Sequence, residues 1–180
     1  MPQQEIKIMV SSTVQGFKDR LTQICAIIEG YSNAKYKYKI ISSHLGTVFP
    51  GNYNAEACLD AVKECDFFLG IIFPRYGSGI AHQEFTEAIK LNKPRWFLVN
   101  HTIPFARLLL QQYMYTSIKF RRRNRSFKFK KISIFDDIRL IDMYNEAIMD
   151  GKPVKKRKWA QEFGHTGSDE FNFLRTLFED

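Results

Sequence analysis

Short apolar runs alternate with amphipathic stretches over the first hundred residues of the chain. Three of the runs, Glu5–Val10, Asp66–Phe73 and Arg95–Asn100, are built largely from Ile, Val, Leu, Met and Phe. Runs of this length and composition are typical of strands that are covered on both faces of a parallel sheet. Tyr38–Ser43 has a similar character and is predicted as a further strand.

Apolar residues recur at helical spacing between these runs. The spacing predicts helices over Val14–Glu29, over Ala55–Cys65 and within the stretch Pro74–Pro94. His44–Asn54 carries the Gly, Pro and Asn residues of a loop. Strands that alternate with helices of this length indicate βαβ crossovers, and hence an α/β fold with a parallel sheet and helices on both faces.

The pattern changes after Asn100. It predicts a helix over Pro104–Ile118 with proline at its first position, a strand-like alternation over Ser126–Lys130, a helix over Phe135–Asp150 and a short docked helix within Trp159–Asp180. We therefore expect residues 1–103 to form the α/β core, and residues 104–180 to form a helical, basic elaboration packed on the same domain.

The composition of the 180 residues is that of a globular domain, with 44% hydrophobic and 26% charged residues. No apolar run approaches the roughly 18 residues that span a bilayer, and the N-terminus lacks the pattern of a signal peptide. We therefore expect a cytoplasmic protein without a membrane partner. The 3 cysteines and 4 histidines lack metal-type spacing, so we expect buried thiols and no metal site.

The net charge of +8 is concentrated in two places. Residues 119–131 hold eight basic residues and no acid, and residues 152–158 hold five more, whereas the remaining chain has 14 basic and 19 acidic residues. Phe127 and Phe129 interleave with the first basic run, so phosphate pairing and base stacking are one interpretation. A solvated hairpin, or a face that meets acidic partners, is the alternative, and the lack of a surrounding nucleic-acid motif favours it.

Polar residues gather where the predicted strands end. Ser11, Ser12 and Thr13 follow the first strand directly and precede a helix. Free backbone N–H groups at a helix start can bind an anion or a ribose, whereas a plain N-cap at Ser12 or Thr13 explains a single hydroxyl equally well.

A second loop is expected at the same edge of the sheet, where ligands of open α/β sheets bind. It contains Arg75, Tyr76 and Gly77. An arginine can hold a pyrophosphate bidentately, a tyrosine offers a stacking face, and a glycine allows close approach of the backbone. This loop is therefore a candidate for substrate binding.

Two carboxylates follow on the next helix. Glu84 lies on the flank of the buried face near the helix N-terminus, and Glu87 lies one turn further and more outward. A carboxylate near a helix start is favoured by the helix dipole and can simply be solvated. The alternative is a Glu84 carboxylate aimed into a cleft beside Arg75 and Tyr76.

Several segments together resemble a known family. They are IKIMVSST with FKDR, AVKECDFFLGIIFPRYGS, QEFTEAIKLNKPRWFLV and, later, IRLIDMYNEAI and KWAQEF. Over nearly its whole length the chain is similar to the TIR-like domain of unknown function found at the head of many bacterial STAND-type NTPases and in small stand-alone proteins. The resemblance implies a flavodoxin-like, TIR-related sheet.

The resemblance also implies kinship with TIR NAD-cleaving enzymes and nucleoside deoxyribosyltransferases. Those enzymes use a glutamate, on the helix after a cleft-forming strand, at the anomeric carbon of a ribose. By position this residue is Glu84, while Ser11 and Ser12 match the loop after the first strand and Arg75–Gly77 match the loop before the helix. Thr86 stands where the family often has a second acid.

These features support three hypotheses. The first is a defence or stress effector that cleaves or transfers at the N-glycosidic bond of a nucleotide, with NAD as a substrate rather than a cofactor. The second is a non-catalytic signalling module that associates with itself. The third is nucleic-acid binding through residues 119–131.

Overall fold

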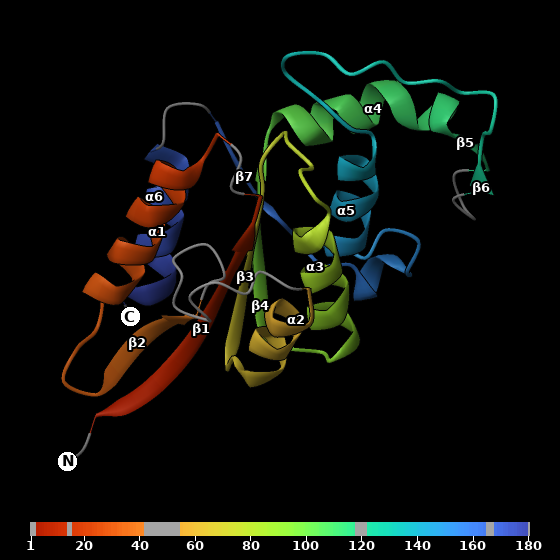
Figure 1. The fold of residues 1–180 in the computed structure, drawn as a ribbon. Coiled ribbons are helices and arrows are strands. Elements are labelled where there is room, and N and C mark those ends of the chain that lie inside the picture. Colours follow the sequence, from red (N-terminus) through yellow and green to blue (C-terminus); the bar gives the residue numbers. More distant parts are fainter. Residues whose placement is uncertain (1–2, 14–15, 42–54, 118–121, 165–167, 180) are drawn as a thin grey trace.

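A computed structural model of the chain describes residues 3–13, 16–41, 55–117, 122–164 and 168–179 (Figure 1). The predicted loop over His44–Asn54, the end of the predicted strand over Tyr38–Ser43 and the start of the basic run at residues 119–121 lie outside the described residues. Among the described residues, no helix is both long and apolar enough to cross a membrane.

A five-stranded, all-parallel sheet forms the centre of the molecule, and its strand order is β2-β1-β3-β4-β7. The strands are β1 (Gln4–Ser12), β2 (Tyr36–Ile41), β3 (Phe67–Ile72), β4 (Arg95–Asn100) and β7 (Gln161–Phe163). This order is that of the flavodoxin-like folds, so the predicted fold class is confirmed.

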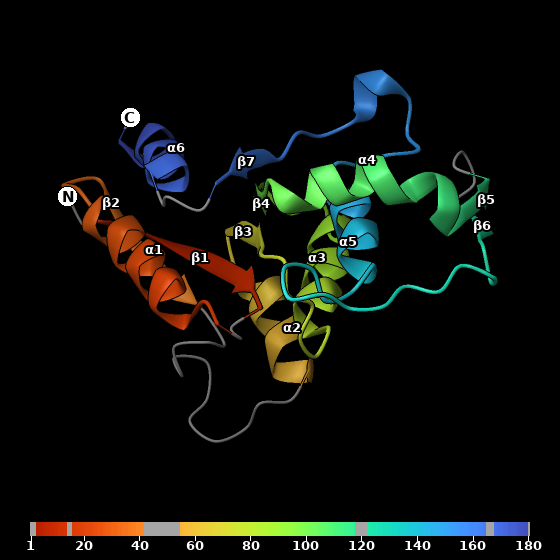
Figure 2. The ribbon, with the colours of Figure 1, turned by 90° about the horizontal axis from the view of Figure 1, so that it is seen from above.

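Helices cover both faces of the sheet (Figure 2). They are α1 (Lys18–Gly30), α2 (Ala55–Glu64), α3 (Ile80–Lys90), α4 (Thr102–Met114), α5 (Arg139–Ala147) and α6 (Ser168–Phe178). A short 3-10 helix, η2 (Val154–Lys156), and a small antiparallel pair, β5 (Tyr115–Ser117) with β6 (Arg122–Arg123), complete the described elements. One apolar core joins the sheet to α2, α3, α4 and α5, and a second joins it to α1 and α6.

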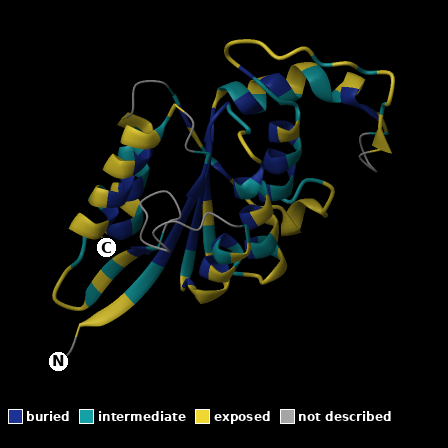
Figure 3. Cartoon of the chain, in the orientation of Figure 1, coloured by how far each residue is buried: buried dark blue, intermediate teal, exposed yellow. Residues whose placement is uncertain are grey.

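Alternate residues of β3 enter the two cores, as the pleat of a strand requires. Phe68 and Ile72 belong to the core under α3, whereas Leu69 and Ile71 belong to the core under α1. Both faces of the strand are therefore covered (Figure 3), which explains why β3 has an unbroken hydrophobic sequence.

Gly70 breaks that pattern because a side chain has no room there. A Cβ atom at this position would lie 2.5 Å from Phe85 Cζ and 2.6 Å from Phe97 Cδ1. In the sheet, Gly70 pairs in register with Ser11 of β1. The missing side chain therefore lets the Phe85 ring of α3 rest directly on the sheet, beside Ser11.

The predicted N-cap of the first helix is wrong. Strand β1 continues through Ser11 and Ser12, which pair in register with β3, so these hydroxyl residues belong to the sheet. Helix α1 begins only at Lys18, and Phe17 occupies its N-cap without a side-chain hydrogen bond.

The predicted start of the fourth helix is also wrong. Helix α4 begins at Thr102, so Pro104 is its third residue rather than its first. Asn100 Oδ1 accepts a hydrogen bond of 3.1 Å from Thr102 N, which allows the helix to start almost directly after β4.

After α4, the C-terminal region holds two confirmed helices, one strand that the pattern missed and one predicted strand that is absent. Helix α5 lies within the predicted span Phe135–Asp150. Helix α6 docks as expected, and Gln161–Phe163 forms the edge strand β7 beside β4. The alternation over Ser126–Lys130 forms no strand, although Phe127 and Phe129 pack on one side against the core. The alternating pattern therefore reflects the burial of these two rings on one side of an extended segment, without pairing to another described strand.

Candidate functional site

The loops after β1 and β3 meet at the carboxyl edge of the sheet. The chain leaves β1 toward one side of the sheet and β3 toward the other, which makes this edge the topological switch point. Ser11 and Ser12 are buried there, and Thr13 follows them. Gly77 has φ +62° and lies so close to Thr13 that a Cβ atom would come 2.5 Å from Thr13 Oγ1. The two predicted loops are thus in direct contact.

Glu84 lies at the same edge and is 0% exposed. It is on the inner face of α3 with Ala81 and Phe85, and the Ser11 hydroxyl donates a hydrogen bond to its Oε2. Its Oε1 accepts no hydrogen bond from the part of the chain that the structure describes. The interpretation of Glu84 as a solvated carboxylate at a helix start is therefore wrong.

Burial controls the acidity of this carboxyl group. It raises the pKa of Glu84 from 4.5 to about 7, while the Ser11 hydroxyl and the Cys58 thiol lower it by smaller amounts. Near neutral pH the group is therefore about half ionised, so it can give up or accept a proton at little cost. Buried polar groups are normally fully hydrogen-bonded, so a buried carboxyl group with an unsatisfied oxygen requires an explanation, and a functional role is one.

The Arg75 guanidinium group is occupied by backbone contacts, which do not fit the predicted phosphate-binding role. The group donates to the backbone oxygens of Pro74, at 3.0 Å, and of Ser133. The backbone N–H of Tyr76 donates to Asp136 Oδ1 at 3.0 Å. Together these bonds fasten the chain before α5 to the loop after β3, which is a structural role.

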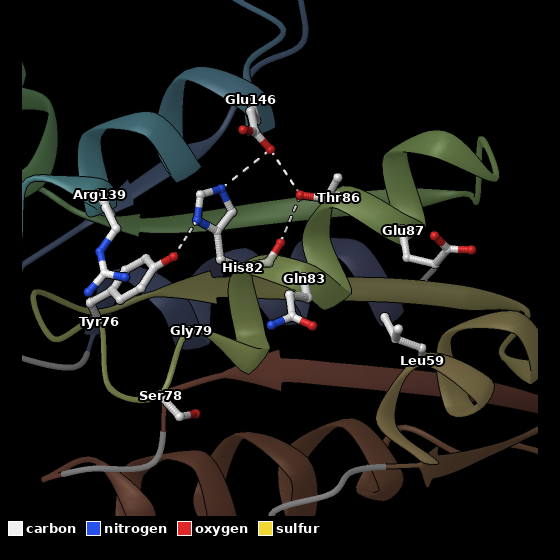
Figure 4. A pocket seen from close by; sticks show the side chains of 10 residues that line it. All are labelled: Leu59, Tyr76, Ser78, Gly79, His82, Gln83, Thr86, Glu87, Arg139 and Glu146. Carbon is white, nitrogen blue, oxygen red and sulfur yellow. Dashed lines mark hydrogen bonds and ion pairs between the residues drawn. The ribbon is translucent and has the colours of Figure 1, made fainter. Parts of the chain in front are cut away.

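A cavity of about 470 Å³ lies on the outer side of α3, between α2 and α5 (Figure 4). Its lining comes from the loop before α3 and from three helices: Leu59, Tyr76, Ser78, Gly79, His82, Gln83, Thr86, Glu87, Arg139 and Glu146. This volume is in the range of small-molecule sites.

The side chains of the cavity form a polar chain. Tyr76 Oη lies 2.8 Å from His82 Nδ1, and His82 Nε2 lies 3.4 Å from Glu146 Oε2. Thr86 Oγ1 donates to the same Glu146 oxygen at 3.0 Å. The Arg139 guanidinium group lies 4.1 Å from the centroid of the Tyr76 ring and stacks on its face. Burial raises the pKa of Tyr76, which keeps its hydroxyl protonated.

The structure thus divides the predicted site residues into three groups. Ser11, Ser12, Thr13, Gly77 and Glu84 meet at the strand edge, Tyr76 and Glu87 line the cavity, and Arg75 belongs to neither. The described lining of the cavity does not include Glu84, because α3 separates them.

Sequence reasoning missed His82, Arg139 and Glu146. The outward positions of α3 hinted at His82, one turn before Thr86, but Glu146 comes from a helix more than sixty residues away. No group of three or more His, Cys, Asp or Glu side chains with metal-binding geometry occurs in the part of the chain that the structure describes.

The model of one protein family, described as a domain of unknown function (DUF4062), matches residues 7–157. The matched span begins in β1 and ends just after η2, so it contains both Glu84 and the whole cavity. A comparison with curated proteins found no match.

Proposed function

The chain belongs to the DUF4062 family of domains of unknown function, and from the geometry of its strand edge we propose that it cleaves or transfers at an N-glycosidic bond. The substrate class is NAD or another nucleotide. The observation that carries this proposal is the buried Glu84 carboxyl group, held by Ser11 at the switch point of the sheet. The setting we propose, a cytoplasmic bacterial defence or stress effector, rests on the resemblance of the sequence to TIR-like domains.

The chemistry follows from the charge that develops on the sugar. When the bond between C1′ and the base nitrogen breaks, its electron pair leaves with the base and C1′ becomes cationic. The ionised Glu84 carboxylate stabilises this cation or bonds to C1′ until water or another acceptor replaces it. A carboxylate in a site of low polarity does this better than one in water.

Neighbouring groups have roles that fit the same reaction. The Ser11 hydroxyl fixes one carboxylate oxygen, which leaves Oε1 to face the sugar. Ser12 and Thr13 supply hydroxyls for the ribose at the end of β1. Because Glu84 is fully covered in this structure, substrate entry has to displace the groups above it.

The proposal is tested by incubating the wild-type protein with NAD, nucleotides and nucleosides and measuring release of the free base. We expect turnover by the wild type and a loss of at least about 100-fold for Glu84→Gln, the size of effect seen when one group that stabilises transition-state charge is removed. Glu64→Gln is the matched control, because Glu64 is exposed at the end of α2. Absence of turnover by concentrated wild-type protein on all of these substrates would contradict the proposal.

The pH dependence of the reaction provides a second test. If the ionised carboxylate reacts, kcat/KM rises with pH and levels off above about 7, the pKa of Glu84 in the free protein. The Ser11 hydroxyl lowers this pKa, so Ser11→Ala is expected to move the midpoint upward. A midpoint near 4.5 in both proteins would show that a different, exposed carboxylate limits the rate.

A non-catalytic signalling module of the same fold is the second candidate function. It is favoured by the complete burial of Glu84, which no substrate can reach in this structure without displacing the groups above it. For such a module, Glu84→Gln would leave the biological effect intact, whereas an enzyme would lose it.

A further inference from the structure

Helix α4 carries apolar residues on two opposite sides. Ile103, Ala106 and Met114 are buried against the core. On the outer side, a set at helical spacing is 52–66% exposed: Phe105, Leu108, Leu109 and Tyr113. We call this set the outer face of α4. A run of large exposed apolar side chains on one side of a helix is the kind of surface that normally meets a partner, so the outer face is a candidate binding surface.

A positively charged segment runs alongside α4 (Figures 1 and 2). Residues 124–134, here called the basic segment, return from β6 alongside α4 (Figures 1 and 2). Phe127 and Phe129 pack toward the core, so the residues between and after them point outward. Three of these, Lys128, Lys130 and Lys131, are exposed and form no ion pair with another described residue, and the same holds for Arg125, which precedes Phe127. Ile132 and Ile134 add exposed apolar area, at 56% and 58%.

We propose that the outer face of α4 and the basic segment together dock onto an anionic lipid surface. The apolar side chains enter the boundary between headgroups and acyl chains, and the lysines pair with the headgroups. Large apolar residues beside uncompensated basic residues are the combination that binds a helix in a membrane interface. The sequence predicted no membrane partner because no apolar run is long enough to span a bilayer. A protein that docks on the membrane surface needs no such run.

Charge argues against a second copy of the chain on this face, and the placement of two aromatic rings argues against a nucleic acid. A second copy seated face to face would bring two basic segments together, and like charges at an interface oppose association. A nucleic acid would satisfy the lysines, but the rings of Phe127 and Phe129, which would have to stack on bases, are turned into the core. The exposed leucines of α4 would have no partner on a phosphate backbone.

The test is sedimentation of the full chain with vesicles of phosphatidylcholine alone and of phosphatidylcholine with phosphatidylserine. We expect binding only to the anionic vesicles, and release when the ionic strength rises from about 0.05 M to about 0.5 M. Each lysine near such a surface strengthens binding by about fivefold, so K128Q/K130Q/K131Q is expected to weaken it by about 100-fold. L108S/L109S is expected to weaken binding at least tenfold, because each leucine loses its burial in the interface.

The matched control is K155Q/K156Q/K158Q, which removes the same charge from the exposed region around η2, away from α4 (Figure 1). Its binding is expected to equal that of the wild type, and circular dichroism of each variant checks that the fold is intact. Failure of the wild type to bind anionic vesicles, or equal losses in both lysine variants, would overturn the proposal. Self-association without lipid that L108S/L109S abolishes would also overturn it, if vesicles do not compete with that association. Tight binding to nucleic acid that L108S/L109S leaves unchanged would overturn it as well, if vesicles do not compete with that binding.

Discussion

Replacing Arg20 with methionine is expected to lower the free energy of unfolding by about 3–5 kcal/mol, the usual cost of leaving a buried charge without its partner. Arg20 of α1 forms an ion pair with Glu170 of α6, which is 0% exposed. The guanidinium group also donates to the Gly164 oxygen at 3.3 Å and lies 5.2 Å from the centroid of the Phe163 ring. One side chain thus connects α1 to α6 and β7. Urea denaturation at pH 7 measures the effect.

Two further variants show whether burial of the carboxylate is the cause. Adding Glu170→Gln to Arg20→Met is expected to restore most of the loss, because a neutral amide costs much less to bury than a charge. Lys90→Met breaks the ion pair with Glu87, in which the lysine is largely exposed, and is expected to cost less than about 1 kcal/mol. Equal losses for Arg20→Met and Lys90→Met would show that the Arg20 pair is worth no more than a surface contact.

Glu84→Gln is expected to stabilise the protein relative to the wild type increasingly as the pH rises. The pKa of Glu84 is about 7 in the folded protein and 4.5 in its ordinary state. Between these values the unfolded chain binds fewer protons than the folded protein, so the wild type loses stability as the pH increases. Glutamine does not titrate, so the difference between the two proteins should grow by about 3 kcal/mol from pH 4 to pH 8.

Urea denaturation of both proteins at the two pH values measures this difference. Glu64→Gln, which removes an exposed carboxylate, is expected to change little over the same range. A constant difference between Glu84→Gln and the wild type would mean that Glu84 is not destabilised by its surroundings. Together with the activity test, a variant that is more stable and inactive would identify Glu84 as a group kept at a cost to stability for the sake of function.

The sheet was largely readable from the sequence because burial on both faces leaves continuous apolar runs. Arg95–Asn100 was predicted to the residue, and Phe67–Ile72 lies within the predicted run. Strand β7 was missed because it has only three residues, Gln161–Phe163, and joins the sheet at one end of β4. So short an element has no periodicity of its own, and the neighbouring strand determines it.

Ends of elements were harder to predict than their centres. Ser12 and Thr13 have the side chains of an N-cap, yet the ladder between β1 and β3 continues through Ser12. Tertiary pairing therefore overrides the local signal. For the same reason Pro104, a residue typical of a first helical position, lies inside α4 once Asn100 has started the helix.

The sequence predicts where the candidate site lies better than it predicts how the side chains of the site are arranged. The strand-edge rule located Gly77 beside Thr13, and the family resemblance pointed to Glu84 on α3. The direction of the Glu84 side chain depends on Ser11, which is 73 residues away, and no helical wheel contains that contact. The position of His82 opposite Glu146 likewise depends on how α3 packs against α5.

The missing side chain of Gly70 affects the chemistry of Glu84, although the two residues lie on different elements. Phe85 settles onto the sheet at this glycine, and residue 84 precedes it on the same helix turn. The height of α3 above the strands therefore sets how far Glu84 stands from Ser11, the in-register neighbour of Gly70. A single methyl group added at position 70 would push Phe85, and with it α3, away from the sheet. The pKa of Glu84 would then change, although no polar atom had been altered.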